Sequence, residues 1–269
     1  MKVFVYGTLL KGMSRSHGLQ NTKFEGLGMI NASLYDLGPY PGIIESTDSV
    51  FGEIYTINSV TLSSLDSIEG YDANYPDGSL YIRKKVDVIL LNDGSSIKAY
   101  AYFYNASDLE AYYEITSGDY RRHILNCKPT WYIAYGSNMD SDRFIERVGD
   151  YKEVRTGYLG GFELVFNKQG DNGSAYANIK YQGAGYSCPF VAYLIDEDQL
   201  DTLDVYEGES RHYIRLGMPF NAANSKTAQL GHVYIAHPNK LTDAAPVNDK
   251  YLNFIKQGYL QHGFEGKHN

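Results

Sequence analysis

Two apolar runs along the chain end in a Tyr-Gly pair. The first is Val3-Phe4-Val5-Tyr6-Gly7-Thr8-Leu9, and the second is Tyr132-Ile133-Ala134-Tyr135-Gly136-Ser137-Asn138. A short continuous apolar run predicts a central strand that is buried on both faces. In both runs the glycine is followed by a small hydroxyl residue, so the two strands are predicted to end in similar turns.

Three more segments occur twice and in the same order. Leu65-Asp66-Ser67-Ile68-Glu69-Gly70 matches Leu203-Asp204-Val205-Tyr206-Glu207-Gly208. Further along, Tyr81-Ile82-Arg83 matches Tyr213-Ile214-Arg215, and the tyrosine-rich run 99–104 matches 231–235. Four matched segments in one order indicate duplication of a whole domain. We expect domains at 1–126 and 130–269, joined near Asn126-Cys127-Lys128-Pro129-Thr130.

Between these segments, strands outnumber helices. Residues 51–57 alternate with period two, and residues 85–90 do so more loosely. Leu62, Leu65 and Ile68 recur at helical spacing, as do Leu200 and Leu203 in the second copy. Asn58 or Ser59 is the expected N-cap of the first helix, and Asp196 that of the second. The predicted fold class is α+β, with two tandem copies of a small, mixed-sheet, barrel-like domain carrying a few helices.

Composition narrows the class of protein. The chain is 43% hydrophobic and 21% charged, which is typical of a globular protein. Its net charge of −8 offers no basic field for phosphate backbones, so nucleic acid is not an expected partner. No apolar stretch approaches the length that spans a bilayer, so we expect no membrane partner. The two cysteines, Cys127 and Cys188, form no disulfide framework, which favours a cytoplasmic location.

Glu69 and Glu207 occupy equivalent and unusual positions. Each is predicted in the last turn of a helix, directly before a glycine that resembles a C-terminal cap. The helix dipole disfavours an anion there by roughly 0.3–1 kcal/mol. One such glutamate would be read as an ordinary exposed residue, but the same placement in both copies indicates a function. If partly buried, these carboxyls should have a raised pKa, which suits a group that accepts and returns a proton.

The two Tyr-Gly segments have two interpretations. A glycine after a strand usually marks only a turn. Alternatively, the N–H groups of Gly7-Thr8-Leu9 and Gly136-Ser137-Asn138 point inward and bind a carboxylate or an oxyanion. In that case the missing Cβ atoms at Gly7 and Gly136 would let a ligand approach the main chain.

Motifs for other chemistries are absent from the sequence. There is no G-x-S-x-G, no P-loop, no dinucleotide fingerprint and no H-E-x-x-H. The seven histidines are scattered. We therefore expect neither a metal nor another cofactor.

The ordered set of segments resembles the γ-glutamylcyclotransferase superfamily. The first copy, with Tyr40-Pro41-Gly42 and Phe51-Gly52-Glu53, is similar to the γ-glutamylamine cyclotransferase, or AIG2-like, branch. The second copy is similar to the γ-glutamylcyclotransferase branch through Arg143, Phe166-Asn167-Lys168, Ala177-Asn178-Ile179 and the closing segment 251–258.

The resemblance implies a reaction and a set of roles. The α-amine of a small γ-glutamyl substrate attacks its own γ-carbonyl, which releases 5-oxoproline and an amine or amino acid. Glu69 and Glu207 would carry the proton, and the two glycine segments, with Tyr6 and Tyr135 before them, would hold the α-carboxylate or the oxyanion. The remaining implied residues are either pocket walls or ordinary core residues: Tyr81, Tyr102, Tyr213 and Tyr234.

Three hypotheses remain open on the sequence alone. The protein is an enzyme with two sites, an enzyme with one working copy and a scaffold or sensor copy, or a non-catalytic module that binds a small acid. Neither the γ-glutamyl compound nor the oligomeric state follows from the sequence.

Overall fold

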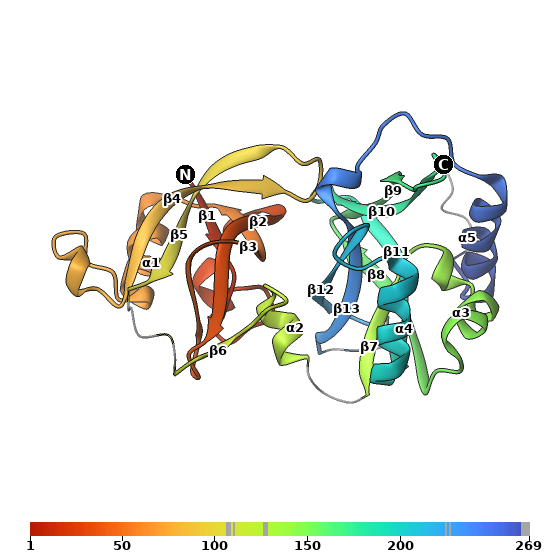
Figure 1. Ribbon diagram of the computed structural model, residues 1–269, viewed down its shortest axis with the longest axis horizontal. Helices are drawn as coiled ribbons and strands as arrows, with labels where there is room; N and C mark the ends of the chain where they lie inside the picture. The colour runs from red at the N-terminus through yellow and green to blue at the C-terminus, as the bar shows by residue number, and fades with distance from the viewer. Residues whose placement is uncertain (106–108, 110, 126–128, 224, 226, 265–269) are drawn as a thin grey trace. The chain divides into compact units, whose positions relative to one another are not determined.

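The computed structural model describes residues 1–105, 109, 111–125, 129–223, 225 and 227–264, which form two compact units (Figure 1). Unit 1 comprises Met1–His123 and unit 2 comprises Ile124–Asn269. Most of the segment predicted to join the domains, residues 126–128, lies outside the described residues.

Unit 1 is a closed barrel of five strands with a short sixth strand at its edge. The strands follow the order β3-β1-β5-β4-β2-β6, and β2 also pairs with β3, which closes the barrel. Strands β1 and β5 run parallel, while the other neighbours run antiparallel. The elements are β1 (Lys2–Val5), η1 (Ser16–Leu19), β2 (Lys23–Asp36), β3 (Pro41–Thr56), α1 (Ser59–Glu69), η2 (Pro76–Gly78), β4 (Tyr81–Leu90), β5 (Ser96–Tyr104), β6 (Tyr113–Glu114) and α2 (Tyr120–Ile124).

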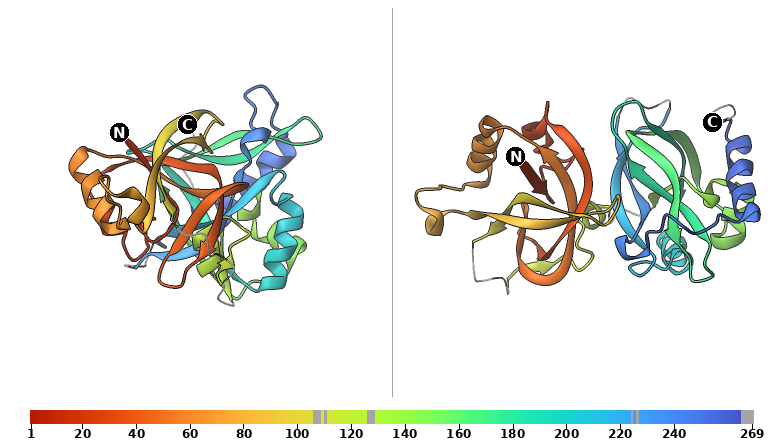
Figure 2. Two further views of the ribbon diagram at one scale, coloured as in Figure 1. Left: turned by 60° about the vertical axis from the view of Figure 1, so that its left-hand side comes forward. Right: turned by 90° about the horizontal axis from the view of Figure 1, so that it is seen from above.

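Unit 2 repeats this plan with a separate two-stranded hairpin and more helices. Its main sheet has the order β12-β13-β7-β11-β8, and β9 and β10 form a separate hairpin. A bridge between Gly157 and Ala222 joins β8 to the chain after β12, so the sheet curls toward closure (Figure 2). The elements are β7 (Thr130–Ala134), η3 (Ser137–Met139), α3 (Ser141–Val148), β8 (Glu153–Gly160), β9 (Phe162–Gln169), β10 (Ala175–Tyr181), β11 (Ser187–Ile195), α4 (Glu197–Glu207), β12 (Tyr213–Phe220), β13 (Gln229–Ala236), η4 (Pro238–Lys240) and α5 (Asp249–Gln261).

The two apolar runs form the central strands β1 and β7, as predicted. Each lies between an antiparallel and a parallel neighbour, and all residues of β7 are buried. The predicted α+β class with two barrel-like copies is confirmed.

Strand β3 differs from its sequence pattern. Alternation over residues 51–57 implied one exposed face, but Glu53 on that stretch is only 3% exposed. Its carboxylate accepts hydrogen bonds from Arg121 Nη2 at 2.6 Å, Tyr55 Oη at 2.8 Å and the Lys11 N–H at 2.8 Å. The polar face is therefore covered, and the buried charge is compensated by an ion pair and hydrogen bonds.

Helices α1 and α4 begin and end at the predicted caps. The Asn58 side chain accepts a hydrogen bond from the Thr61 N–H at 2.8 Å, and Asp196 is the N-cap of α4. Both helices end at a glycine in the left-handed conformation, with φ of 62° at Gly70 and 60° at Gly208. These caps fix Glu69 and Glu207 as the last residues of their helices.

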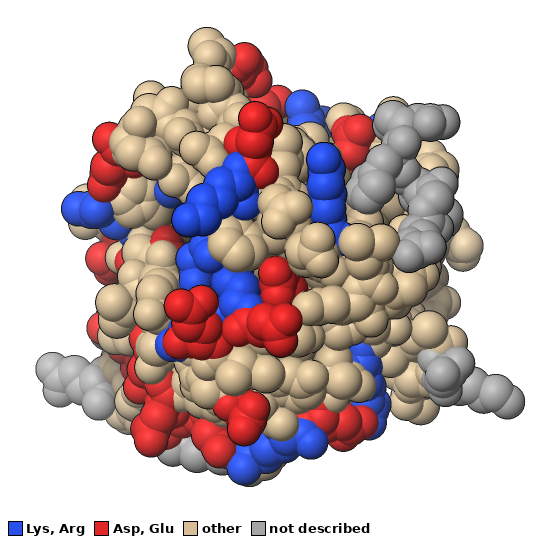
Figure 3. Space-filling view, turned by 90° about the vertical axis from the view of Figure 1, so that its right-hand side faces the viewer, with Lys and Arg blue, Asp and Glu red and all other residues tan. Residues whose placement is uncertain are grey.

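Charges of both signs are intermixed on one face of the molecule. On the face drawn in Figure 3, Lys and Arg side chains lie beside Asp and Glu side chains and form no continuous basic area. Across the described residues, no helix is both long enough and apolar enough to cross a membrane.

Candidate active site

A cavity of about 530 Å³ in unit 2 surrounds Glu207. Its volume falls within the roughly 300–1,000 Å³ of typical small-molecule sites. All seven residues that the sequence analysis assigned to the second site line it: Tyr135, Gly136, Ser137, Asn138, Glu207, Tyr213 and Tyr234. The structure thus brings together segments that are more than 70 residues apart in the chain.

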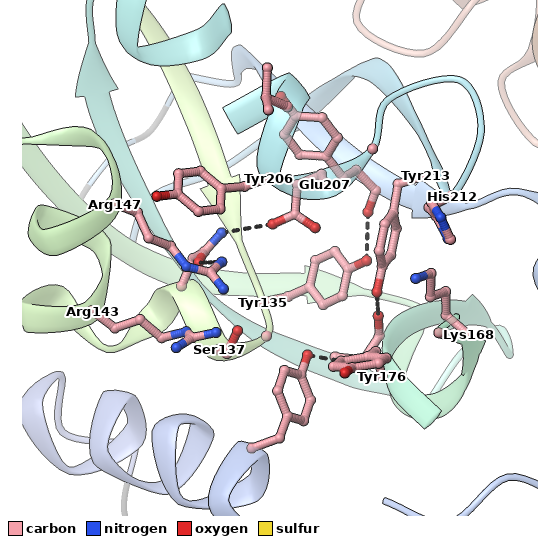
Figure 4. A pocket seen from close by; sticks show the side chains of 18 of the residues that line it. Tyr135, Ser137, Arg143, Arg147, Lys168, Tyr176, Tyr206, Glu207, His212 and Tyr213 are labelled. Carbon is pink, nitrogen blue, oxygen red and sulfur yellow. Dashed lines mark hydrogen bonds between the residues drawn. The ribbon is translucent and has the colours of Figure 1, made fainter. Parts of the chain in front are cut away.

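Hydrogen bonds fix this arrangement (Figure 4). The Asn138 amide donates from Nδ2 to Glu207 Oε1 at 3.0 Å, which links the glycine loop to the end of α4. Tyr135 donates from its hydroxyl to the Tyr234 carbonyl at 2.5 Å. Tyr213 donates in the same way to the Ala177 carbonyl at 2.7 Å, and so attaches the β9–β10 hairpin to β12.

The Glu207 carboxyl lies in a strongly charged setting. Burial raises its pKa above the ordinary value and is the main influence. Arg147, the Asn138 amide, Lys168 and Arg143 act in the opposite direction. The raised pKa expected from the sequence is therefore present, and burial is its principal cause.

Unit 1 contains an equivalent but much smaller site. Its cavity has a volume of about 20 Å³, which is close to the room that one water molecule needs. All seven residues assigned to the first site line it: Tyr6, Gly7, Thr8, Leu9, Glu69, Tyr81 and Tyr102. Burial raises the pKa of Glu69 to about 7, although nearby Arg15 opposes the rise.

The role suggested for the missing Cβ atoms is wrong. A Cβ at Gly7 would lie 2.5 Å from Pro41 Cγ, and a Cβ at Gly136 would lie 3.0 Å from Ala177 Cβ. Protein atoms thus occupy the space that was expected to admit a ligand. The glycines instead allow the neighbouring hairpin to pack directly against the loop.

Four tyrosines were predicted to be either pocket walls or core residues, and the structure shows that they are both: Tyr81, Tyr102, Tyr213 and Tyr234. Each is at least 93% buried and also lines a cavity. Tyr102 donates a 2.7 Å hydrogen bond to Asp66, and Tyr234 donates one of 2.6 Å to Asp204.

Arginine completes both of these networks. Asp66 pairs with Arg83, and Asp204 pairs with Arg215 Nη2 at 3.1 Å. Asp66 and Asp204 lie three residues before the two glutamates. These networks therefore attach the helix that carries each glutamate to the sheet.

The sequence analysis named Arg143 and Lys168 only as part of the family resemblance and did not name Arg147, but all three line the unit 2 cavity. Arg147 Nη1 donates to Asn138 Oδ1 at 2.9 Å, and Arg143 stacks on the Phe254 ring at 4.0 Å. The two arginines are four residues apart on α3, and residues at this spacing share one face of a helix. That spacing is the signal that would have identified them.

The described part of the chain contains neither a reactive cysteine nor a cluster of side chains that could bind a metal ion. Burial raises the pKa of Cys188 to about 12, which disfavours the reactive thiolate. Cys127 lies outside the described residues. No cluster of three or more His, Cys, Asp or Glu side chains that could hold a metal ion occurs among those described.

Comparison with known proteins agrees with the duplicated site. The family model "Gamma-glutamyl cyclotransferase, AIG2-like" matches residues 3–122 and again residues 132–255. The chain belongs to this family. A putative gamma-glutamylcyclotransferase of Methanocaldococcus jannaschii is 37% identical over 123 residues, which cover 44% of this chain and 94% of that protein.

A relative of similar length has the same tandem organisation. The putative gamma-glutamylcyclotransferase YkqA of Bacillus subtilis is 26% identical over 234 residues, covering 78% of this chain and 80% of YkqA. The crystal structure of YkqA superposes with a TM-score of 0.75 at 24% identity, over 97% of this chain and 91% of that one. That likeness supports the two-domain fold.

Proposed function

We propose that this protein is a cyclotransferase that cleaves γ-glutamyl amides or dipeptides to 5-oxoproline and a free amine or amino acid. The observation that carries the proposal is Glu207, a half-buried carboxyl with a raised pKa that lines a cavity of about 530 Å³. A carboxyl with a raised pKa accepts a proton more readily than an ordinary one and can return it.

Glu207 is proposed to act on both nitrogens of the reaction. It takes a proton from the substrate α-ammonium, whose free amine then attacks the γ-carbonyl carbon. A new C–N bond forms between the amine nitrogen and the γ-carbon, and the original amide C–N bond breaks as Glu207 passes its proton to the departing nitrogen. The ring nitrogen then gives up its second hydrogen as a proton, which Glu207 accepts and the departing amine takes up, so that 5-oxoproline and a protonated amine leave. The nucleophile belongs to the substrate, so the chain has to supply only positioning and proton transfer.

The glycine loop is proposed to hold the substrate's negative charge. Within the described residues, the N–H groups of Ser137 and Asn138 donate to no backbone or side-chain acceptor. Arg143 and Arg147 line the cavity beside them (Figure 4). Free N–H groups and two guanidinium groups favour a carboxylate or a developing oxyanion there.

The two units are proposed to contribute unequally. Glu69 has the same chemistry as Glu207, with a pKa of about 7, but its cavity of about 20 Å³ is too small for a γ-glutamyl group. This observation favours a main catalytic site in unit 2. Unit 1 then acts as a scaffold or sensor, or binds substrate only after Pro41 moves.

A 5-oxoproline release assay tests the proposal against γ-glutamyl dipeptides, γ-glutamylamines and glutathione. We expect Glu207→Gln to reduce release by about 10²-fold or more, and Glu69→Gln to have a smaller effect. Asp201→Asn, at an exposed position on α4, is the matched control. If no substrate yields 5-oxoproline although ligands bind, the protein is a small-acid-binding module instead.

A further inference from the structure

Lys168 is a buried basic residue of the unit 2 cavity. The residue is 6% exposed, yet its side chain lines the unit 2 cavity. Its Nζ lies 5.1 Å from the centre of the Tyr213 ring and 5.2 Å from that of Tyr176. No carboxylate forms an ion pair with it, and no acceptor hydrogen-bonds to it, in the part of the chain that the structure describes.

The two acids that act on Lys168 electrostatically, Glu207 and Asp171, both have other partners. Asp171 already contacts three other basic groups: Arg211 Nη2 at 3.1 Å, His212 Nε2 at 3.2 Å and Lys240 Nζ at 3.5 Å. Glu207 also influences Lys168 electrostatically, but its hydrogen bond is to Asn138. This side of the cavity therefore carries excess positive charge. Burying a cation is costly unless an anion accompanies it, so the cavity is suited to an anionic ligand group.

Two cationic walls face each other across the catalytic carboxyl. Figure 4 places Arg143 and Arg147 on one side of Glu207, next to Ser137, and Lys168 on the other. Burial lowers the pKa of His212 beside Lys168, which disfavours the charged form of that imidazole, so Lys168 is the cation considered on this side. A substrate with a single anionic group could contact only one of these two walls, so the presence of both favours a substrate with two anionic groups. A γ-glutamyl compound held by its α-carboxylate at the arginine wall would direct its leaving group toward Lys168.

Unit 1 lacks this second wall. The hydroxyls of Tyr81 and Tyr213 bind the equivalent carbonyls of Pro41 and Ala177, which aligns the two hairpins. In this alignment Lys168, which pairs with Tyr176, corresponds to Leu37, whose N–H donates to the Tyr40 carbonyl at 3.1 Å. The sequences agree, since Tyr35-Asp36-Leu37 matches Phe166-Asn167-Lys168. An apolar residue thus stands where unit 2 has its free cation.

We propose that Lys168 is the specificity-determining residue of a second anion subsite in unit 2, which binds a carboxylate on the leaving group of the substrate. The inference rests on the proposed function of Glu207. Unit 2 accordingly prefers γ-glutamyl amino acids and peptides over γ-glutamylamines, which lack that carboxylate.

Paired substrates test the subsite in the full-length protein. γ-Glutamylglycine and its C-terminal carboxamide differ only in the charge beyond the scissile bond. We expect kcat/KM to favour the carboxylate form by roughly tenfold or more, and Lys168→Met to remove most of that preference. Lys256→Met, at an exposed position on α5, should leave the ratio unchanged.

Two outcomes overturn the subsite while leaving the proposed function intact. One is equal turnover of both substrates by the wild type. The other is an equal loss on both substrates in Lys168→Met, which would mean that Lys168 binds the α-carboxylate.

A binding measurement separates the subsite from the reaction. Calorimetry on Glu207→Gln, with and without Lys168→Met, compares the affinities of the same two compounds. A preference for the carboxylate form that disappears with Lys168→Met supports the subsite even if no 5-oxoproline is formed, in which case the proposed function alone fails. Equal affinities, or no binding of either compound, overturn the subsite.

Discussion

Tyr234 donates a hydrogen bond of 2.6 Å from its hydroxyl to Asp204 Oδ1, and Asp204 lies almost one helical turn before Glu207 on α4. Tyr102 and Asp66 form the same bond at 2.7 Å in unit 1. In both units a sheet tyrosine therefore holds the helix whose last residue is the glutamate. The aspartate of the Leu-Asp-x-x-Glu-Gly segment is a positioning residue.

Tyr234→Phe should lower the free energy of unfolding of unit 2 by about 1 kcal/mol, the net worth of a typical hydrogen bond. It should also reduce kcat, because α4 loses part of its attachment to the sheet. Chemical denaturation and the 5-oxoproline assay measure the two effects. As a control, Tyr186→Phe removes a hydroxyl from an exposed tyrosine and should change neither the free energy of unfolding nor kcat. Unchanged kcat in Tyr234→Phe would argue against positioning.

The stability of unit 1 should decrease as pH rises from about 4.5 to about 7. Burial raises the pKa of Glu69 from 4.5 to about 7, so the folded state holds a proton that the unfolded chain releases in this range. The loss is at most about 3 kcal/mol. Glu69→Gln should flatten this dependence and be more stable than the wild type at pH 8. Thermal unfolding at pH 5 and pH 8 measures the difference, with Glu45→Gln, an exposed glutamate, as control.

Arg147→Met should move the acid limb of the kcat/KM profile to higher pH. Glu207 must be ionised to accept a proton, and Arg147 lowers the pKa of its carboxyl. Loss of the Arg147 hydrogen bond to Asn138 should also reduce kcat, but it would not shift the limb. The charged or titratable groups that face Glu207 are Tyr132, Tyr135, Arg143, Arg147, Lys168, Tyr213 and Tyr251. Arg155→Met, outside the cavity lining, should leave the profile in place; an unmoved limb in Arg147→Met would contradict the assignment.

Gly7→Ala should destabilise unit 1 more than Gly136→Ala destabilises unit 2. The new Cβ at position 7 would meet the stiff Pro41 ring at 2.5 Å, whereas the one at position 136 would meet Ala177 Cβ at 3.0 Å. Overpacking of this kind typically costs about 1–3 kcal/mol. Trp131 is the only tryptophan and lies in β7, so its fluorescence follows unit 2 while circular dichroism follows both units. Equal losses in the two variants would contradict the prediction.

The sequence predicted the parts of the structure that depend on local patterns. The central strands, the caps of α1 and α4, and the meeting of each glutamate with its glycine loop all agree with the structure. Each of these features follows from a short sequence pattern that occurs once in each copy. The repetition showed that these patterns were not chance matches.

Properties that depend on distant contacts could not be predicted in this way. The cavity volumes of about 20 Å³ and about 530 Å³ depend on how each hairpin, at Pro41 in unit 1 and at Ala177 in unit 2, packs against its glycine loop, which local periodicity does not encode. The free charge of Lys168 becomes apparent only once Asp171 is seen to be occupied by other cations. The raised pKa of the two glutamates was likewise only a conditional prediction, because it requires burial, which is a property of the assembled fold.

The parallel pairing of β1 with β5 has a consequence for synthesis on the ribosome. Val3 is opposite Tyr100, so β1 cannot pair along both of its edges until nearly the whole of unit 1 has been synthesised. The same holds for Tyr132 and His232 in unit 2. Nascent chains that stall before residue 96 or residue 229 expose an apolar strand with one unpaired edge, and these are the stages at which chaperone capture or misassembly is expected.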